Sequence, residues 1–407
     1  MLDYDVLKFI GLDQQITLMS KGDMMINSEF KNKPIFALDL QSYLADLEYL
    51  VNIDSGSYDR EGVQAVSAFF IEQFSQLGWR ANLVEVDDKL APCVEIFSPS
   101  CGKEIDNLLL GHLDTVFPKG TVAQRPFHIE AQRAYGPGVA DMKSGALYCL
   151  YLARAYYAAG ITPPAICVAL NSHEEIGSRQ ARPWLEDLAR RARRTLVIEP
   201  GRANGDMVIA RRGSCRYTLL FTGKAAHSGV DPQNGASAVN EAAHWTIELH
   251  KLTDYAQEFN LNVGILEGGV SVNAVADSAR IELDVRFSAM EQADIVQKRL
   301  DEMQAAPFTV GVSVEVIGGV TRPPMSPSEE SLELARFVDQ VAEELGVKIG
   351  WQHTGGGSDG NFTAALGIPT LDGMGPIGGR AHSREEYLEI NSIESRFTLL
   401  AAVIDQL

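Results

Sequence analysis

The chain has 407 residues, of which 45% are hydrophobic and 22% charged; it is long enough for two domains and too apolar to be disordered. Its 35 basic and 54 acidic residues give a net charge of −19, which argues against a nucleic-acid partner because phosphate binding needs a basic surface. No apolar run approaches the ~18 residues of a membrane-spanning helix, and MLDYDVLKFIGLDQQ does not read as a secretory signal. Five widely spaced cysteines without a C-x-x-C pair argue against a disulfide framework or a thiolate zinc site. We therefore expect a cytoplasmic protein without a membrane partner.

The first elements along the chain predict an α/β domain. Residues 1–35 carry no motif and are treated as an N-terminal extension. Helical patterns then alternate with three short apolar runs, each bounded by turn residues as buried strands are. The helical patterns cover 38–51, 62–77, 143–159 and 180–193, and the apolar runs cover 107–116, 165–175 and 195–200. This alternation is typical of a sheet covered by helices on both faces.

The pattern changes near Gly213. Strands and helices then follow in the order β-α-β-β-α-β, the split βαβ arrangement. The strands are expected over 216–221, 261–267, 279–287 and 312–317, and the helices over 236–252 and 290–303. Helix, strand and loop resume from Ser328, so this small domain is expected to interrupt the first one. The predicted domains are an N-terminal extension at 1–35, a catalytic domain at 36–212 and 321–407, and an inserted, lid-like domain at 213–320.

Side chains of metal-ligand type follow all three apolar runs. The first run ends in His112 and Asp114, the second in Glu174 and Glu175, and the third in Glu199. Open α/β sheets place their sites beyond the carboxyl ends of the strands. We therefore expect these five side chains to meet at one edge of the sheet.

Two further segments complete this set. YGPGVADMK supplies Asp141 at the start of a helix, and GGRAHSREEY supplies His382 in a glycine-rich loop. Nitrogen and carboxylate ligands without thiolates suit zinc, cobalt or manganese. Two cations about 3.5–4 Å apart need a carboxylate between them. Asp114 shares a strand face with His112 and is a candidate to fix the histidine ring.

These motifs carry a resemblance to a known family. GHLDTV, GPGVADMK, the EE pair and VIEP resemble the di-zinc exopeptidases of the glutamate carboxypeptidase family, which also holds acetylornithine deacetylase, succinyl-diaminopimelate desuccinylase and aminoacylase. The resemblance covers about residues 40–407. It implies a zinc-exopeptidase-like catalytic domain, with a mixed sheet flanked by helices, and an inserted ferredoxin-like lid through which two chains form a homodimer.

The resemblance also implies a role for each matched residue. Glu174 would be the general base, and Asp114 would orient a histidine ligand. At position 199 some relatives have aspartate, and the glutamate of this chain resembles the residue found in the carboxypeptidase and aminoacylase branches of the family. The resemblance implies two divalent metal ions, with zinc as the first expectation and cobalt or manganese as alternatives. Asp141 would bridge the two ions. His112 and Glu199 would bind one ion, and Glu175 and His382 would bind the other.

The inserted domain carries matches too. TGKAAHSG resembles the segment whose histidine, here His227, reaches the partner's active site and holds the oxyanion. VNAVADSARIELDVRF resembles the segment with a substrate-binding asparagine and arginine, here Asn273 and Arg286. The alternatives are a strand-surface ion pair for Arg286 and a turn position for Asn273. Arg322, just before Pro323, is interpreted as a surface charge at the hinge.

The predicted reaction is hydrolysis of an amide bond in a small peptide or an N-acyl amino acid. We expect a carboxypeptidase that releases a C-terminal amino acid, with glutamate-like side chains as the leading preference. The alternative is an N-acyl-amino-acid deacylase, which would also recognise a free carboxylate. A third reading, from a different class, is a binding protein that has lost catalysis. That reading predicts a missing base or ligand, whereas all the expected positions are filled.

Overall fold

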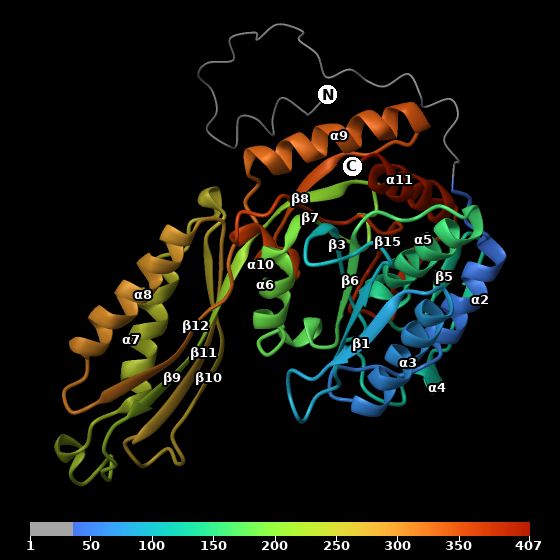
Figure 1. Ribbon diagram of the computed structural model, residues 1–407. Helices are drawn as coiled ribbons and strands as arrows, with labels where there is room; N and C mark the ends of the chain where they lie inside the picture. Colours follow the sequence, from blue (N-terminus) through green and yellow to red (C-terminus); the bar gives the residue numbers. More distant parts are fainter. Residues whose placement is uncertain (1–35) are drawn as a thin grey trace, which may run out of the picture.

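The computed structural model describes residues 36–407, so the expected extension at 1–35 lies outside the described residues (Figure 1). Its larger part is built on a six-stranded sheet in the order β1-β2-β6-β3-β7-β14. β6, β3, β7 and β14 run parallel, whereas β1 and β2 pair in antiparallel fashion, so the sheet is mixed. The strands are Arg80–Val84 (β1), Cys93–Phe97 (β2), Ile105–His112 (β3), Ile166–Asn171 (β6), Ala192–Val197 (β7) and Thr370–Leu371 (β14).

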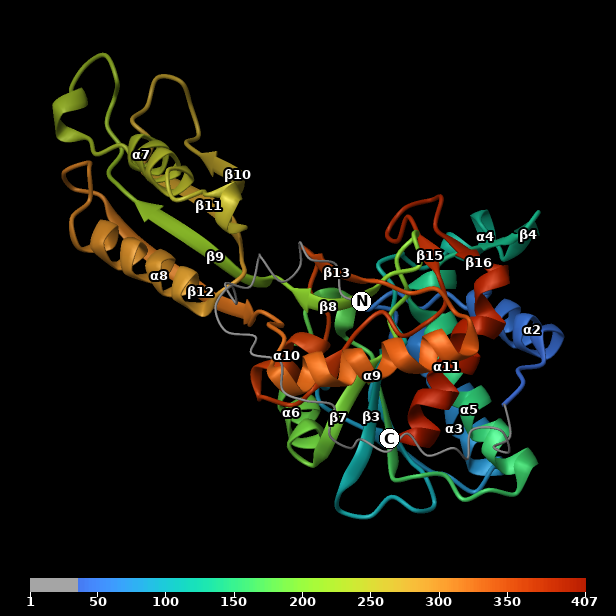
Figure 2. The ribbon, with the colours of Figure 1, turned by 90° about the horizontal axis from the view of Figure 1, so that it is seen from above.

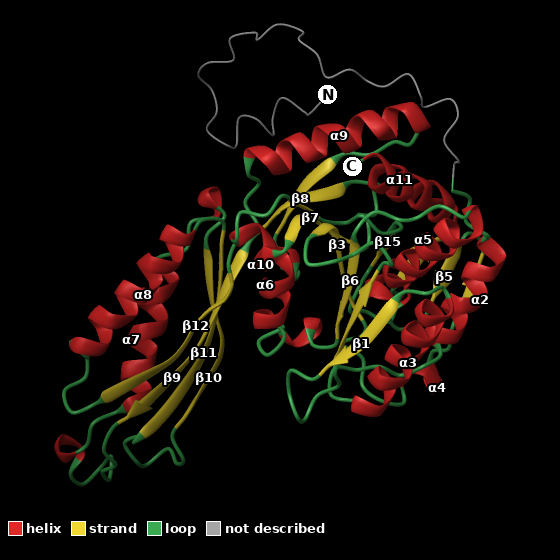
Figure 3. Cartoon of the chain, in the orientation of Figure 1, coloured by secondary structure: helices red, strands yellow, loops and turns green. Residues whose placement is uncertain are grey.

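Helices cover both faces of this sheet, as the unbroken apolar runs predict. In β3, Leu109 packs into a core with α2, α3, α5, α9 and α11, whereas Leu108 and Leu110 pack into a second core with α6 and α10. Figure 3 shows these helices on either side of the strands. The helices are Leu40–Val51 (α2), Arg60–Gln76 (α3), Gly145–Ala159 (α5), Arg182–Arg190 (α6), Glu329–Leu345 (α9), Gly360–Ala365 (α10) and Ile393–Gln406 (α11).

Smaller elements surround the large sheet. Tyr387–Glu389 (β16) pairs with β15 and β5, and the loop between β15 and β16 carries His382. The other small elements are Thr121–Gln124 (α4), His128–Glu130 (β4), Arg133–Tyr135 (β5), Met207–Arg211 (β8), Trp351–Thr354 (β13) and Gly378–Gly379 (β15). Within residues 36–407, no helix is long and apolar enough to cross a membrane.

A second sheet forms the inserted domain, in the order β10-β11-β9-β12 with all pairs antiparallel. The chain order is the predicted β-α-β-β-α-β, and the two helices bury a separate core that includes Trp245 and Leu300. Figures 1 and 2 show this domain projecting from the larger part. Its elements are Gly213–Thr222 (β9), Ala238–His250 (α7), Asn260–Gly268 (β10), Ser278–Phe287 (β11), Met290–Ala305 (α8) and Ser313–Arg322 (β12).

Candidate metal centre

Three neighbouring parallel strands bring ligand side chains to one edge of the large sheet. β3 ends at His112, a short 3-10 turn after β6 carries Glu174 and Glu175, and Glu199 follows β7 by two residues. β3 lies between β6 and β7 in the sheet. The carboxyl ends of these strands therefore deliver all four side chains to the same place, as open α/β sheets do.

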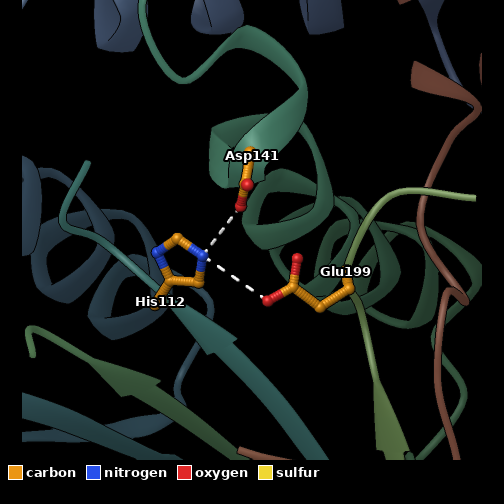
Figure 4. Close-up of side chains that lie close together, drawn as sticks. All are labelled: His112, Asp141 and Glu199. Carbon is orange, nitrogen blue, oxygen red and sulfur yellow. Dashed lines mark hydrogen bonds and ion pairs between the residues drawn. The ribbon is translucent and has the colours of Figure 1, made fainter. Parts of the chain in front are cut away.

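Asp141 lies between two histidines and faces each with a different oxygen. Its Oδ1 is 3.0 Å from His112 Nε2, and its Oδ2 is 3.3 Å from His382 Nε2. Glu199 Oε1 lies 3.5 Å from His112 Nε2 (Figure 4), and Glu175 Oε2 lies 3.0 Å from His382 Nε2. The ligand atoms of each triad lie within 4.8 Å of one another, and the triads are His112–Asp141–Glu199 and Asp141–Glu175–His382.

The donor set fits two divalent ions that share Asp141. Each triad offers one imidazole nitrogen and two carboxylates, the ligand types of zinc, cobalt and manganese. The charges fit as well, because burial raises the pKa of both Glu175 and Glu199, and the negative charge of Asp141 raises them further. The neighbouring carboxylates of Asp141 and Glu175 raise the pKa of His382 to about 11. Cations at these positions would compensate the crowded carboxylates.

A glycine allows the Asp141 loop to approach the end of β7. A Cβ added at Gly145, the first residue of α5, would lie 1.9 Å from the carbonyl oxygen of Ile198. Since no side chain fits there, only glycine lets α5 begin against the residue that precedes Glu199. This close approach sets Asp141 opposite Glu199.

Asp114 is buried beneath the centre and contacts three parts of it. His112 Nδ1 lies 3.0 Å from the carbonyl oxygen of Asp114 and 3.5 Å from its Oδ1. These two oxygens favour a proton on Nδ1, and a proton there leaves the Nε2 lone pair free for a metal ion. The Asp114 carboxylate also accepts hydrogen bonds from the backbone N–H groups of Glu174 and Glu175, both at 3.2 Å. It therefore fixes the 3-10 turn as well as the ring.

Arg322 contacts Glu174, so its interpretation as a surface charge is wrong. It is 7% exposed, and its Nη2 lies 2.8 Å from Glu174 Oε1 while its Nη1 lies 2.8 Å from Asp359 Oδ1. Burial raises the pKa of Glu174 well above its usual value, and the positive charge of Arg322 opposes this. The sequence predicts that β12 ends at residue 317. In the structure the strand continues through Gly318 and Gly319, and its last residue, Arg322, lies at the centre.

The sequence also gave no role to Glu386, which is 1% exposed. Its Oε2 accepts a hydrogen bond from Gly138 N at 3.0 Å, and its Oε1 accepts from Ala140 N and Asp141 N at 2.9 and 3.0 Å. One carboxylate thus ties the loop of the shared aspartate to the segment that follows His382. Its position four residues after His382 is the signal that the sequence offers, although Glu385 beside it has the same side chain.

We predict that Glu386→Gln weakens metal binding. The amide keeps one acceptor oxygen, and its NH2 group would face one of the three backbone donors. Loss of such an outer partner lowers metal affinity by about 10–100-fold. The affinity is measured by competition between the metal-free protein and a chromophoric chelator. Glu385→Gln is the matched control, because that exposed neighbour pairs with Arg380. Equal affinities in the two variants would contradict this role for Glu386.

The remaining predicted residues lie in the inserted domain, and only one of them lines the cleft beside the centre. Arg286 lines a cleft together with Glu174, Glu175 and His382, although its guanidinium also pairs with Asp284 at 2.8 Å. The cleft holds about 870 Å³.

His227 and Asn273 lie elsewhere, beside each other at the far end of β11. Ser228 N donates to the carbonyl oxygen of Asn273 at 3.0 Å, and both His227 and Asn273 are exposed. From that end, Ser278 to Arg286 is about 27 Å of strand at ~3.4 Å per residue. Within one chain, the structure does not bring His227 or Asn273 to the metal ligands.

Comparisons with known proteins identify the family. The model described as Peptidase family M20/M25/M40 matches residues 108–406. The chain belongs to this peptidase family. The match confirms the resemblance read from the motifs, and it makes the chain a metal-dependent hydrolase with the expected mixed α/β fold and an inserted domain.

The family relatives include both peptidases and deacylases. Carboxypeptidase G2 of Pseudomonas sp. (strain RS-16) is 31% identical over 368 residues, which cover 88% of this chain and 87% of that protein. Succinyl-diaminopimelate desuccinylase of Dechloromonas aromatica (strain RCB) is 26% identical over 323 residues, 73% of this chain and 82% of that protein. A tripeptidase from Staphylococcus aureus has a TM-score of 0.75 at 22% identity, covers 91% of this chain and 99% of its own, and shows the shared fold.

Proposed function

We propose that this family member is a two-metal amidohydrolase, most simply with zinc, which cleaves the amide bond of a C-terminal amino acid. The observation that carries the proposal is Asp141, whose two carboxylate oxygens face His112 and His382 from opposite triads. When bound, two such ions would polarise the scissile carbonyl and acidify the attacking water. A binding protein without catalysis is disfavoured, because neither the base nor any ligand is missing.

Glu174 is the proposed general base. It stands directly before the ligand Glu175, and its Oε1 is held by Arg322 at 2.8 Å. In this role it takes a proton from water and passes it to the leaving amine. Asp114 supports the step without touching substrate, because it fixes the backbone of the turn on which Glu174 stands.

The proposed substrate is a small peptide or an N-acyl amino acid with a free α-carboxylate. Arg286 is the proposed partner of that carboxylate, since a guanidinium binds a carboxylate through two hydrogen bonds. The likeness to a protein named carboxypeptidase supports peptide cleavage with a glutamate-like preference. The likeness to a desuccinylase keeps N-acyl-amino-acid deacylation as the second candidate.

We predict that Arg286→Ala lowers kcat/KM for substrates with a free α-carboxylate by about 10–100-fold more than for their α-amides, the effect of losing hydrogen bonds to a charged group. Steady-state rates on paired substrates measure this difference. Arg280→Ala is a suitable control, because Arg280 stands on the same face of β11 but pairs with Glu282 and does not line the cleft. Equal losses for acids and amides would make Arg286 structural.

We further propose that the inserted domain is the lid and the dimerisation surface, and that His227 and Asn273 act on the partner's active site. Their place beyond the Ser278 end of β11, remote from the cleft, supports action across a dimer. β10 lies at the edge of its sheet and can pair with a second copy. A cytoplasmic location remains our proposal, supported by five buried cysteines that are all free.

The proposal is tested with a panel of dipeptides and N-acyl amino acids, assayed after loading with zinc, cobalt or manganese. Release of free amino acid from dipeptides at the higher kcat/KM supports the carboxypeptidase, whereas faster turnover of N-acyl amino acids supports the deacylase. No release from any compound with any of the three metals would refute both.

A further inference from the structure

The cleft beside the metal centre is unusually rich in arginine for so acidic a chain. Among the described residues that line it, the only carboxylates are Glu174 and Glu175, which belong to the centre itself. The chain as a whole carries a net charge of −19. Five arginines line the cleft: Arg179, Arg182, Arg216, Arg286 and Arg322. A cationic wall of this kind concentrates anionic ligands.

Two of these arginines already have partners. Arg322 is buried between Glu174 and Asp359, at 2.8 Å from each. Arg286 pairs with Asp284 at 2.8 Å and is the proposed partner of the substrate α-carboxylate. The positive charges of Arg322 and Arg286 are therefore already matched, by protein carboxylates and by the proposed α-carboxylate, so neither arginine is assigned to a further anionic group of the substrate.

The other three arginines carry positive charge that the protein does not fully compensate. Arg179 is exposed and forms no ion pair with any residue that the structure describes. Arg216 lies 3.8 Å from Asp284, a carboxylate that Arg286 already holds at 2.8 Å. An anionic group that entered the cleft would meet these guanidinium groups with little competition from protein carboxylates.

The positive charge of Arg182 is also only partly compensated by protein carboxylates. It pairs with Glu186 at 2.6 Å, but Glu186 also accepts an ion pair from Arg190 at 3.0 Å. Two guanidinium groups therefore share one carboxylate on α6. The Arg182 side chain also stacks over Phe362, which holds its guanidinium at the wall of the cleft.

The backbone before Arg179 is anchored close to the catalytic residues. Ser178 N donates to the carbonyl oxygen of His173 at 2.8 Å, and Ser178 Oγ donates to Asp359 Oδ1 at 2.5 Å. The backbone that carries Arg179, four residues after Glu175, is therefore held in place by Ser178. The cleft also has room, because a Cβ added at Gly319 or Gly356 would meet nothing within 4 Å.

We propose that Arg179, with Arg182 and Arg216 in the same cleft, forms a subsite for a second carboxylate of the substrate. This rests on the proposed function and narrows its substrate class to compounds with two carboxylates. The second one stands either on the side chain of the released amino acid or on the acyl group. A planar guanidinium binds either through paired hydrogen bonds.

Two isosteric substrate pairs test the subsite and distinguish the two sources. N-acetyl-glutamate and N-acetyl-glutamine differ in the side-chain carboxylate, whereas N-succinyl-leucine and N-succinamoyl-leucine differ in the acyl carboxylate. We expect the metal-loaded protein to favour the carboxylate member of one pair by about tenfold or more in kcat/KM. Arg179→Gln should reduce that ratio to about threefold or less, the remainder coming from Arg182 and Arg216. Arg193→Gln should keep the ratio, because Arg193 is exposed, pairs with Asp106 and lies outside the cleft.

Calorimetric binding of the same four compounds to the metal-loaded Glu174→Gln protein separates this inference from the proposed function. A charge preference in binding upholds the subsite even if the native chain hydrolyses none of the four compounds. The amidohydrolase is then judged separately, by the full panel of dipeptides and N-acyl amino acids. Ratios near one in both pairs, or equal losses for carboxylate and amide in Arg179→Gln, would overturn the subsite while leaving the amidohydrolase standing. Absence of binding by all four would also overturn it.

Discussion

The Glu174→Gln protein is expected to bind metal like the native chain and to lose at least ~10²-fold in kcat, the lower range for removal of a general base. The carboxamide keeps the shape of the side chain and can still accept a hydrogen bond from Arg322, but it cannot take a proton from water. Glu175 and the other ligands are untouched. Metal content by elemental analysis and steady-state rates on the best substrate of the panel measure the two effects.

Glu344→Gln is the control for this substitution, because Glu344 is an exposed glutamate on α9. It should leave both metal content and rate at native values. If Glu174→Gln retains more than about a tenth of the native kcat, another group is the base. If it loses metal together with activity, Glu174 acts as a ligand and its proposed role is wrong.

Mixed dimers of His227→Ala and Glu174→Gln are expected to recover about a quarter of native activity, although each parent is almost inactive. Removal of one oxyanion donor costs about 10²–10³ in rate. In a mixed dimer, the intact Glu174 of one chain and the intact His227 of the other form one complete site, and the second site has both defects. Random exchange makes about half of the dimers mixed, each with one good site of two.

The subunits are exchanged in mild denaturant or by co-expression, and mixing is confirmed by mass before rates are measured. Confirmed mixed dimers that stay as inactive as their parents would show that His227 does not act on the partner's site. A monomer by light scattering at micromolar concentration would remove the shared-site mechanism altogether. Within one chain, His227 is exposed and lies beyond the end of β11 that is remote from Arg286, so the structure shows no contact between it and the metal ligands.

The parts of this protein that depend on local pattern could be predicted from the sequence. The strand before His112 and the strand before Glu174 are apolar runs bounded by turns, and parallel pairing brings their ends together. In the inserted domain, alternation along β11 and the helical spacing of α8 place both elements within two residues of their expected bounds. The roles of His227 and Asn273 rest on the family resemblance.

The contacts that depend on distant residues could not be predicted in the same way. Arg322 meets Glu174 across 148 residues, and Glu386 meets Asp141 across 245. Nothing in the local sequence distinguishes a buried arginine from a surface one, or Glu386 from Glu385. The sequence also predicts too short a β12, because glycine weakens the interior of a strand, whereas here Gly318 and Gly319 continue the pairing with β9.

Titration of the metal-free protein with zinc, followed by the rate of amino-acid release, tests the central claim most directly. The shared position of Asp141 between His112 and His382 predicts that the rate rises from near zero and levels off at two equivalents per chain. A rate that does not depend on metal, or one that is complete at a single equivalent, would contradict a two-metal amidohydrolase.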